Sequence, residues 1–267
     1  MKSKYIEYSI YKPAGNDTAF VYGTDYTSDE KKLINDAIMA KNPNVEQVGF
    51  LNINGKTELQ MAGGEFCGNA TRSAAQEYLK GQAGSIKMIV NCNDIINAGV
   101  DVNGKAWCEI PLPTETNIIT QKEPGIFIIK LNGMTTIVIQ EDVSEKYLEN
   151  RKDLKKIGMS FIQKYKLEES KAVGVIFCER ENKLLKINPV VWVKSINTTF
   201  YETACGSGTT AVAILEAFQK RNSQSIDIIQ PSGMIITAQV TYSKEKILKA
   251  VITGEVKKDE NKYSLKI

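Results

Sequence analysis

The pattern of apolar and polar positions divides the chain into short β-type runs and a few helical segments. Asn-Gly pairs stand at 54–55, 103–104 and 132–133, each between alternating or β-rich runs. An Asn-Gly pair in that setting is the strongest short-range hairpin signal, because both residues readily adopt a positive φ. The sequence therefore predicts three β-hairpins.

Two amphipathic helices are predicted between the strands. One follows Ser28, and the other spans roughly Glu145 to Tyr165. Their apolar faces are formed by Leu33, Ile34, Ala37 and Ile38 in the first helix, and by Leu154, Ile157, Phe161 and Tyr165 in the second. The second helix mixes lysines and arginines with acids, so we read its polar side as a solvated face rather than a nucleic-acid site.

Two further helices are predicted after matched Cys-Gly units. "GGEFCGNATRSAAQEYLK" runs from Gly63 to Lys80, and "ETACGSGTTAVAILEAFQK" runs from Glu202 to Lys220. Asn69 and Ser207 are favourable N-cap residues, so we expect the helices to begin there. The second of these helices is apolar nearly all round and should be buried. Its apolar residues are Ala211, Val212, Ala213, Ile214, Leu215, Ala217 and Phe218.

The same order of elements occurs in each half of the chain: strands, an amphipathic helix, more strands, then a Cys-Gly helix. This order predicts a duplicated α+β protein with a boundary near "IPLPTETN", residues 110–117. We therefore expect one domain over residues 1–115 and a second over 116–257. Residues 258–267 are expected to return to the first.

The amino-acid composition excludes several classes of catalytic and metal site. The 267 residues include no histidine, which excludes Ser-His-Asp and Cys-His catalysis and any zinc site that needs imidazole. Five scattered cysteines fit a reducing cytoplasm, and a net charge of +3 predicts no nucleic-acid or membrane partner. No apolar run reaches the length of a membrane span.

Cys67 and Cys205 each precede a predicted helix, where unpaired N–H groups favour an anion and can lower a thiol pKa. If the halves face each other, the two helix starts converge on one small carboxylate, with a thiol on either side of the adjoining carbon. One thiolate then removes an α-proton while the other thiol supplies one to the opposite face. Such a racemase needs neither metal nor pyridoxal phosphate.

Other interpretations of the cysteines remain. Cys92, Cys108 and Cys178 lie in strand-like runs and are predicted to be small buried hydrophobes. Cys67 and Cys205 also allow a thiol redox protein, although the chain lacks a C-x-x-C motif. A non-catalytic amino-acid-binding protein is the third reading.

"CGNAT" at Cys67 and "ACGSGT" at Ala204 resemble the two motifs of the diaminopimelate epimerase-like racemases, over essentially the whole chain. The resemblance implies two pseudo-symmetric domains, each with a β-rich, barrel-like sheet around a central helix. It implies that Cys67 and Cys205 are the acid/base pair in a cleft of a homodimeric enzyme. It further assigns residues to the substrate: Gly68, Asn69, Gly206 and Ser207 on the α-carboxylate, with Asn16 ("PAGND") and Gln47 ("VEQVGF") as further contacts.

Departures from that family concern the far end of the substrate. Ile196 and Asn197 stand where diaminopimelate epimerases carry a Glu-Arg pair, so a different amino acid is expected. "GGEFCGNAT" resembles most the histidine racemases of the opine-metallophore branch. Glu46, Glu65 and Glu202 suit a cationic side chain, although ordinary surface or capping roles are equally open for each. A divergent diaminopimelate epimerase, or a racemase of lanthionine or another amino acid, is the alternative.

Overall fold

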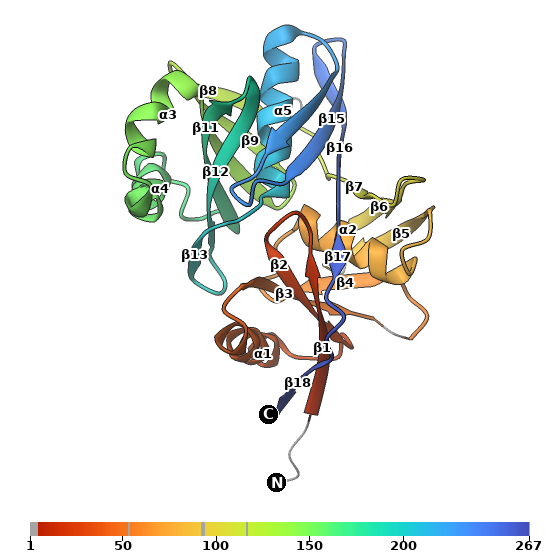
Figure 1. Ribbon diagram of the computed structural model, residues 1–267. Coiled ribbons are helices and arrows are strands. Elements are labelled where there is room, and N and C mark those ends of the chain that lie inside the picture. Colours follow the sequence, from red (N-terminus) through yellow and green to blue (C-terminus); the bar gives the residue numbers. More distant parts are fainter. Residues whose placement is uncertain (1–4, 53, 92–93, 116, 267) are drawn as a thin grey trace.

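The computed structural model describes residues 5–52, 54–91, 94–115 and 117–266, and its elements form two lobes (Figure 1). The first lobe contains β1 (Tyr5–Lys12), β2 (Asp17–Tyr22), α1 (Ser28–Lys41), β3 (Val45–Leu51), β4 (Glu58–Met61), α2 (Gly68–Tyr78), β5 (Gly84–Val90), β6 (Asp94–Val100) and β7 (Ala106–Glu109).

The second lobe begins with β8 (Ile119–Glu123), β9 (Ile126–Leu131), β10 (Met134–Ile139), α3 (Glu141–Leu148), the 3₁₀ turn Arg151–Asp153 and α4 (Leu154–Lys164). It continues with β11 (Ala172–Glu181), β12 (Leu184–Val193), β13 (Thr198–Tyr201), α5 (Gly206–Lys220), β14 (Gln224–Ile229), β15 (Ile235–Ser243) and β16 (Lys246–Gly254). Two short strands, β17 (Lys257–Lys258) and β18 (Tyr263–Lys266), end the chain.

Strand pairing repeats between the lobes. The first pair is antiparallel in each (β1–β2 and β9–β10), and the next strand is parallel (β2–β3 and β10–β11). After the antiparallel pairs β3–β4 and β11–β12, the strand that follows the Cys-Gly helix is again parallel (β4–β5 and β12–β14). The α+β class and its repeated sheet are thus as the sequence predicts, while the division at residue 115 stays a prediction.

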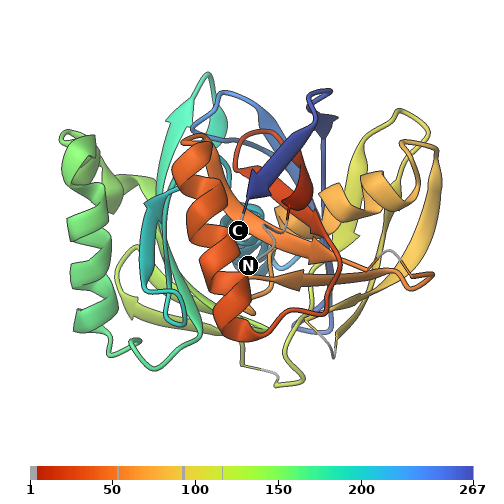
Figure 2. The ribbon, with the colours of Figure 1, turned by 90° about the horizontal axis from the view of Figure 1, so that it is seen from below.

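The C-terminal strands return to the first lobe. β17 and β18 pair antiparallel with β1, so the C-terminal strands lie beside the first strand of the chain (Figure 2). Beside β1, β18 holds the place that β8 holds beside β9 in the second lobe. The C-terminal segment thereby completes the repeat.

The three predicted hairpins are confirmed, at β3–β4, β6–β7 and β9–β10. Helix α1 also forms where expected, with Thr27 and Glu30 as a capping box. Its buried face is narrower than predicted, because Leu33 is 56% exposed while Ile34 and Ile38 are buried.

The helix predicted over residues 145–165 is wrong as a single element. Helix α3 begins earlier, at Glu141, and α4 begins at Leu154, with the 3₁₀ turn between them. The break falls at Asn150, whose φ of −123° and ψ of 74° are not helical. Leu154 and Phe161 of the predicted face are nevertheless buried.

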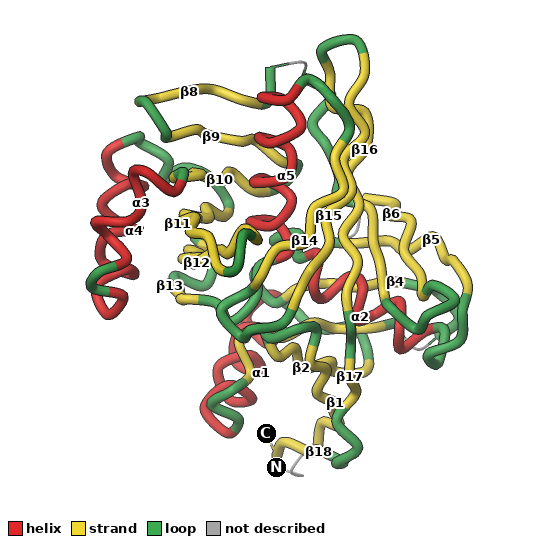
Figure 3. The backbone as a smooth tube through the Cα atoms, turned by 45° about the horizontal axis from the view of Figure 1, so that its top comes forward, coloured by secondary structure: helices red, strands yellow, loops and turns green. Residues whose placement is uncertain are grey.

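Helix α5 is buried among the strands of the second lobe, as its apolar sequence predicts, and packs against β9, β10, β14, β15 and β16 (Figure 3). Phe218, near its C-terminal end, is the exception at 44% exposed. Helix α2 packs in the same way against β5, β6 and β7. No helix in the described parts of the chain combines the length and apolar character needed to cross a bilayer.

Leu265→Ala tests the return of the C-terminal strand. Leu265 on β18 is buried with Ile6 and Ile10 of β1, so we expect the free energy of unfolding to fall by about 2 kcal/mol. Urea denaturation measures this, with exposed Lys266→Ala as the control. Equal stability of the two variants would show that β18 does not dock in solution.

Candidate active site

Cys67 and Cys205 are themselves the N-caps of α2 and α5. The Sγ atom of Cys67 accepts a hydrogen bond from the backbone N–H of Ala70 at 3.4 Å, and Cys205 Sγ accepts one from Gly208 at 3.4 Å. Both cysteines have extended φ and ψ angles, as N-cap residues do. Each sulfur thus lies at the positive end of a helix.

The predicted N-caps Asn69 and Ser207 are therefore wrong by two residues. Both lie inside the first helical turn and are buried, and the helices begin at Gly68 and Gly206. A cysteine sulfur replaces the usual hydroxyl or carboxyl acceptor, which residue preferences alone do not anticipate. Ser207 Oγ instead lies 3.6 Å from Cys205 Sγ.

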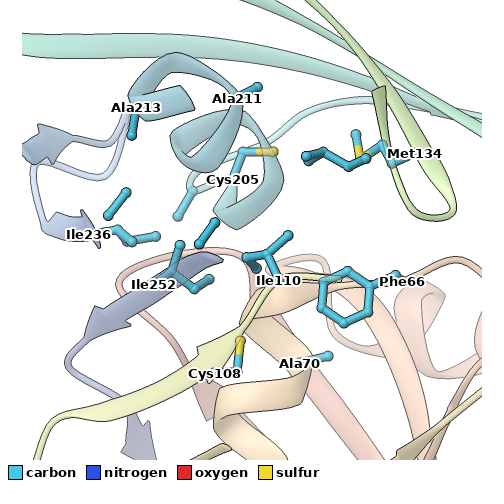
Figure 4. Close-up of a cluster of buried hydrophobic side chains, with 14 of the residues drawn as sticks. Phe66, Ala70, Cys108, Ile110, Met134, Cys205, Ala211, Ala213, Ile236 and Ile252 are labelled. Carbon is cyan, nitrogen blue, oxygen red and sulfur yellow. The ribbon is translucent and has the colours of Figure 1, made fainter. Parts of the chain in front are cut away.

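The N-terminal ends of α2 and α5 meet. Asn69 Nδ2 donates to the Ala204 carbonyl oxygen across the lobes at 3.1 Å. Ile252 lies between the helices (Figure 4). Its Cδ1 atom is 2.8 Å from the position of a Cβ on Gly68 and 2.7 Å from that of a Cβ on Gly206. A larger residue at either position would require the Ile252 side chain to move, so the two glycines leave room for Ile252 between the helix ends.

Asn16 and Gln47, which were expected to contact the substrate, lie next to each other. Asn16 adopts a left-handed φ of 57°, and its Oδ1 accepts a hydrogen bond from Gln47 Nε2. Gln47 Nε2 also donates to Thr18 Oγ1 at 2.7 Å, and the Gln47 side chain acts to lower the pKa of the Cys67 thiol. This pair therefore connects the first-lobe sheet to the first cysteine.

Glu46 joins the two lobes. Its carboxylate accepts from Asn16 Nδ2 at 2.9 Å in the first lobe and from Thr203 Oγ1 at 2.5 Å in the second. The Thr203 N–H donates to both of its oxygens at 3.2 Å. Because its acceptor sites are already in use, Glu46 is better placed to hold the lobes together than to contact a ligand.

A small cavity of about 30 Å³ lies among the carboxylates. Glu46, Gln47, Glu65 and Glu202 line one part, and apolar side chains line the rest: Val48, Val191, Val193, Ile196 and Phe200. Glu65 Oε2 is buried without a hydrogen-bond partner in the described part of the chain. A cavity of this size holds a water molecule and is smaller than an amino acid.

Burial dominates the thiol pKa values. Desolvation, together with the nearby Glu202 and Glu65, raises the pKa of Cys67 to about 12, although the Ala70 N–H acts to lower it. Desolvation and a hydrogen bond to Glu202 raise the pKa of Cys205 well above its ordinary value. The lowered thiol pKa predicted from the helix N-termini is therefore wrong for this closed arrangement.

The carboxylates crowd one another as well. Desolvation raises the pKa of Glu46, Glu65 and Glu202, and Glu202 reaches about 8 with the charges of the other two contributing. Three acids that resist ionisation together form a site that a cation would stabilise.

Sequence reasoning missed two residues of this site. The Thr203 hydroxyl donates a hydrogen bond to the Glu46 carboxylate and accepts one from the Asn16 N–H at 2.6 Å. Arg72 is fully buried behind Asn69. A lone cation among small residues of "CGNATR" was the available signal for Arg72. Cys108 and Cys178 are buried in the core as expected, and Cys92 lies outside the described residues.

Solved structures share this fold. A phenazine biosynthesis protein of the PhzF family from Bacillus anthracis matches with a TM-score of 0.63 and 14% identity, over 100% of both chains. A hydroxyproline epimerase from Agrobacterium vitis matches with a TM-score of 0.62 and 11% identity, over 100% of this chain and 92% of its own. At these identities the likeness shows the fold.

The family model and the curated relatives that match the chain define an isomerase of the racemase class. More narrowly, the chain belongs to the histidine racemase family, because the family model "Histidine racemase CntK N-terminal domain" matches residues 5–259. Histidine racemase of Fusobacterium nucleatum subsp. nucleatum is 28% identical over 247 residues, 88% of this chain and 89% of that one. Histidine racemase of Staphylococcus aureus is 24% identical over 253 residues, with the same coverage.

The raised pKa of Glu202 predicts a pH-dependent effect of Glu202→Gln. Between the ordinary pKa of 4.5 and about 8, the folded protein holds a proton that the unfolded chain has released. The contribution of the Glu202 carboxyl to the free energy of unfolding of the wild type therefore falls as the pH rises from 4.5 to about 8. The melting temperature of Glu202→Gln should exceed that of wild type by a margin that is small at pH 5 and grows to pH 9.

Thermal melts at both pH values test this, with the exposed Glu168→Gln as a matched charge-removal control. A margin independent of pH would contradict the buried, proton-holding state of Glu202.

Proposed function

We propose that this protein interconverts L- and D-histidine without pyridoxal phosphate, using Cys67 and Cys205 as the two acid/base groups. The observation that carries the proposal is the meeting of two cysteine-capped helix ends beside a group of three carboxylates. The relatives named histidine racemase support histidine as the substrate.

In the proposed reaction, one cysteine is a thiolate and the other a thiol. The thiolate takes the α-proton and the C–H electron pair is delocalised into the carboxylate. That pair then returns to the α-carbon and takes the proton of the opposing thiol on the other face, which leaves that sulfur as the thiolate. The roles of the two sulfurs are then exchanged. A thiolate with a raised pKa is a stronger base, which suits removal of a weakly acidic α-proton.

The substrate carboxylate is assigned to the helix ends. The first-turn N–H groups of α2 and α5, at Gly68-Asn69 and Gly206-Ser207, have no earlier turn to bond to. Together with the two helix dipoles, they would stabilise the charge that builds on the carboxylate as the proton leaves. Asn16 and Gln47 are assigned to the first-lobe side of the same substrate.

The imidazole is assigned to Glu65 and Glu202. Glu65 Oε2 has no partner in the described part of the chain, and Glu202 ionises only with difficulty while the site is empty of cations. A protonated imidazole next to them would supply both a donor and a positive charge. Phe200 and Val193 line the apolar part of this pocket.

We further propose that the enzyme acts in the cytoplasm as a homodimer. The resemblance to the diaminopimelate epimerase-like racemases supports the dimer, and unpaired cysteines fit a reducing compartment. Light scattering of the purified protein tests the dimer, and a monomeric mass at micromolar concentration would contradict it.

Loss of the α-proton signal of histidine in D₂O tests the activity. Purified reduced protein with no added cofactor should remove the signal and yield D-histidine by chiral chromatography. Cys67→Ser and Cys205→Ser should each reduce racemisation by at least about 100-fold, because a serine hydroxyl is a far weaker acid. Cys178→Ala, a buried thiol on β11, is the control and should remain active.

Exchange with another amino acid but not histidine would replace the substrate and keep the mechanism. Lanthionine and diaminopimelate are the first to try. Exchange with no amino acid would overturn the racemase proposal. In that case, binding of an amino acid without exchange would indicate a binding protein. Reversible oxidation of the two cysteines would instead favour a redox role.

Glu65→Gln tests whether Glu65 binds the imidazole of the substrate. It leaves an amide where a carboxylate would bond to a cation, so we expect KM for histidine to rise about tenfold or more. Glu46→Gln is the contrasting variant, because it weakens the hydrogen bonds between the lobes and should lower the melting temperature. Equal KM in wild type and Glu65→Gln would remove Glu65 from the substrate pocket.

A further inference from the structure

The turn between β1 and β2 has a strained backbone. Ala14, Gly15 and Asn16 follow one another with φ angles of 61°, 101° and 57°. A residue with a side chain disfavours this left-handed region, so Ala14 and Asn16 keep it only where their surroundings hold them. Both are buried. The contacts that hold the turn of residues 14–16 therefore also place Asn16, which the proposed function assigns to the substrate.

Every residue of this turn meets the second lobe. Ser232 Oγ donates to the Ala14 carbonyl oxygen at 2.5 Å, and the Asn16 N–H donates to Thr203 Oγ1 at 2.6 Å. A Cβ on Gly15 would lie 2.8 Å from the Thr203 carbonyl oxygen and 3.0 Å from Ser232 Cβ. Gly15 is thus left-handed and also too close to the second lobe for a side chain. The turn is closely fitted to Thr203 and Ser232.

The second-lobe side of this contact is bonded to the segment that carries Cys205. The Ser232 N–H donates to the Thr203 carbonyl oxygen at 3.0 Å, and the Cys205 N–H donates to Gln230 Oε1 at 2.9 Å. Residues 203–205 are therefore held at two points by the loop that follows β14. Gln230 is itself buried. Thr203 and Cys205 are held as one unit, so a movement of the Cys205 segment reaches Asn16.

A related contact occurs at the corresponding place in the other half of the chain. The β9–β10 turn is the counterpart of the β1–β2 turn, and a Cβ on its Gly133 would lie 3.7 Å from the Cβ of Phe66, directly before Cys67. Each lobe thus presents the turn of its first antiparallel pair to the residues before the opposite cysteine. The contact at Phe66 is a packing contact, whereas Thr203 hydrogen-bonds to the backbone of Asn16.

We propose that Thr203 is a positioning residue. When the lobes are closed, its hydroxyl holds the turn of residues 14–16 and so fixes Asn16 for the substrate from the lobe that carries Cys205. Asn16 in turn holds Gln47, whose Nε2 donates to Asn16 Oδ1. The same hydroxyl donates to Glu46 Oε1 at 2.5 Å, so one surface threonine contacts two first-lobe residues at the site. The inference rests on the proposed function, which gives Asn16 and Gln47 the substrate as their partner.

The test compares Thr203→Val with Thr203→Ser, by backbone hydrogen exchange of the substrate-free protein and by the kinetics of histidine racemisation. Valine keeps the side-chain shape and removes the acceptor, so the Asn16 amide should exchange about tenfold faster and KM for histidine should rise about tenfold, with a smaller change in kcat. Serine keeps the hydroxyl and should hold both values within about twofold of wild type.

Thr237→Val is the matched control, because Thr237 Oγ1 also donates to a carboxylate, that of Asp227, at 2.6 Å, but within the second lobe. It should leave the exchange of the Asn16 amide and KM unchanged. Thr203 is exposed, so its replacement by valine should not unfold the protein. If it does, Ser232→Ala tests the same turn, because it removes the bond to Ala14 and should also speed exchange there.

Unchanged exchange of the Asn16 amide in a folded Thr203→Val protein would overturn the proposal. Faster exchange with an unchanged KM would also overturn it, because Thr203 would then have a structural role alone. An equal rise of KM in Thr203→Ser would show that the hydroxyl is not what acts. If wild type does not racemise histidine, the proposed function fails by itself, and the exchange rates of the two variants still decide whether the Thr203 hydroxyl holds the turn.

Discussion

The meeting of two helix N-termini is the contact on which the rest of the structure depends. Two positive helix ends repel each other, yet α2 and α5 are held close by the Asn69–Ala204 hydrogen bond and by Ile252 packed against two glycines. Most residues of both helices are buried against strands, so it is their N-terminal ends that face each other. Cysteine sulfurs cap both helix ends, and carboxylates from both lobes lie beside them. The junction therefore favours an anion at the helix ends, while the pocket around it is acidic.

Closure of the lobes sets the electrostatics of that junction. Hydrogen bonds cross between the lobes at Glu46–Thr203, at Ser195 Oγ to the Gly63 carbonyl oxygen (2.8 Å) and at Ser232 Oγ to the Ala14 carbonyl oxygen (2.5 Å). In the closed state both thiols and all three acids resist ionisation. In the proposed function, an amino acid reaches the cysteines when these contacts give way, and its ammonium and carboxylate groups then change the charges around the thiols and acids.

Local sequence signals predicted much of the fold. The three Asn-Gly hairpins, helix α1 and the buried helix α5 follow from turn chemistry and periodicity, which act over a few residues. The predictions that failed depend on tertiary contacts. The chain leaves the helical conformation at Asn150, and Leu33 and Phe218 are exposed. Cys67 and Cys205 are the N-caps that Asn69 and Ser207 were expected to be. The direction of the thiol pKa shift was missed because it depends on burial by the opposite lobe. Thr203 and Arg72 were missed because their contacts join residues far apart in sequence.

The most direct test of the two-thiol account is the position of deuterium during the first turnovers of L-histidine in D₂O. Two monoprotic groups on opposite faces predict that D-histidine carries deuterium at the α-carbon while the remaining L-histidine still carries hydrogen, because each thiol returns only its own proton. Chiral separation followed by mass spectrometry measures both pools. Deuterium entering both enantiomers equally from the start would indicate a single exchanging base and would contradict the account.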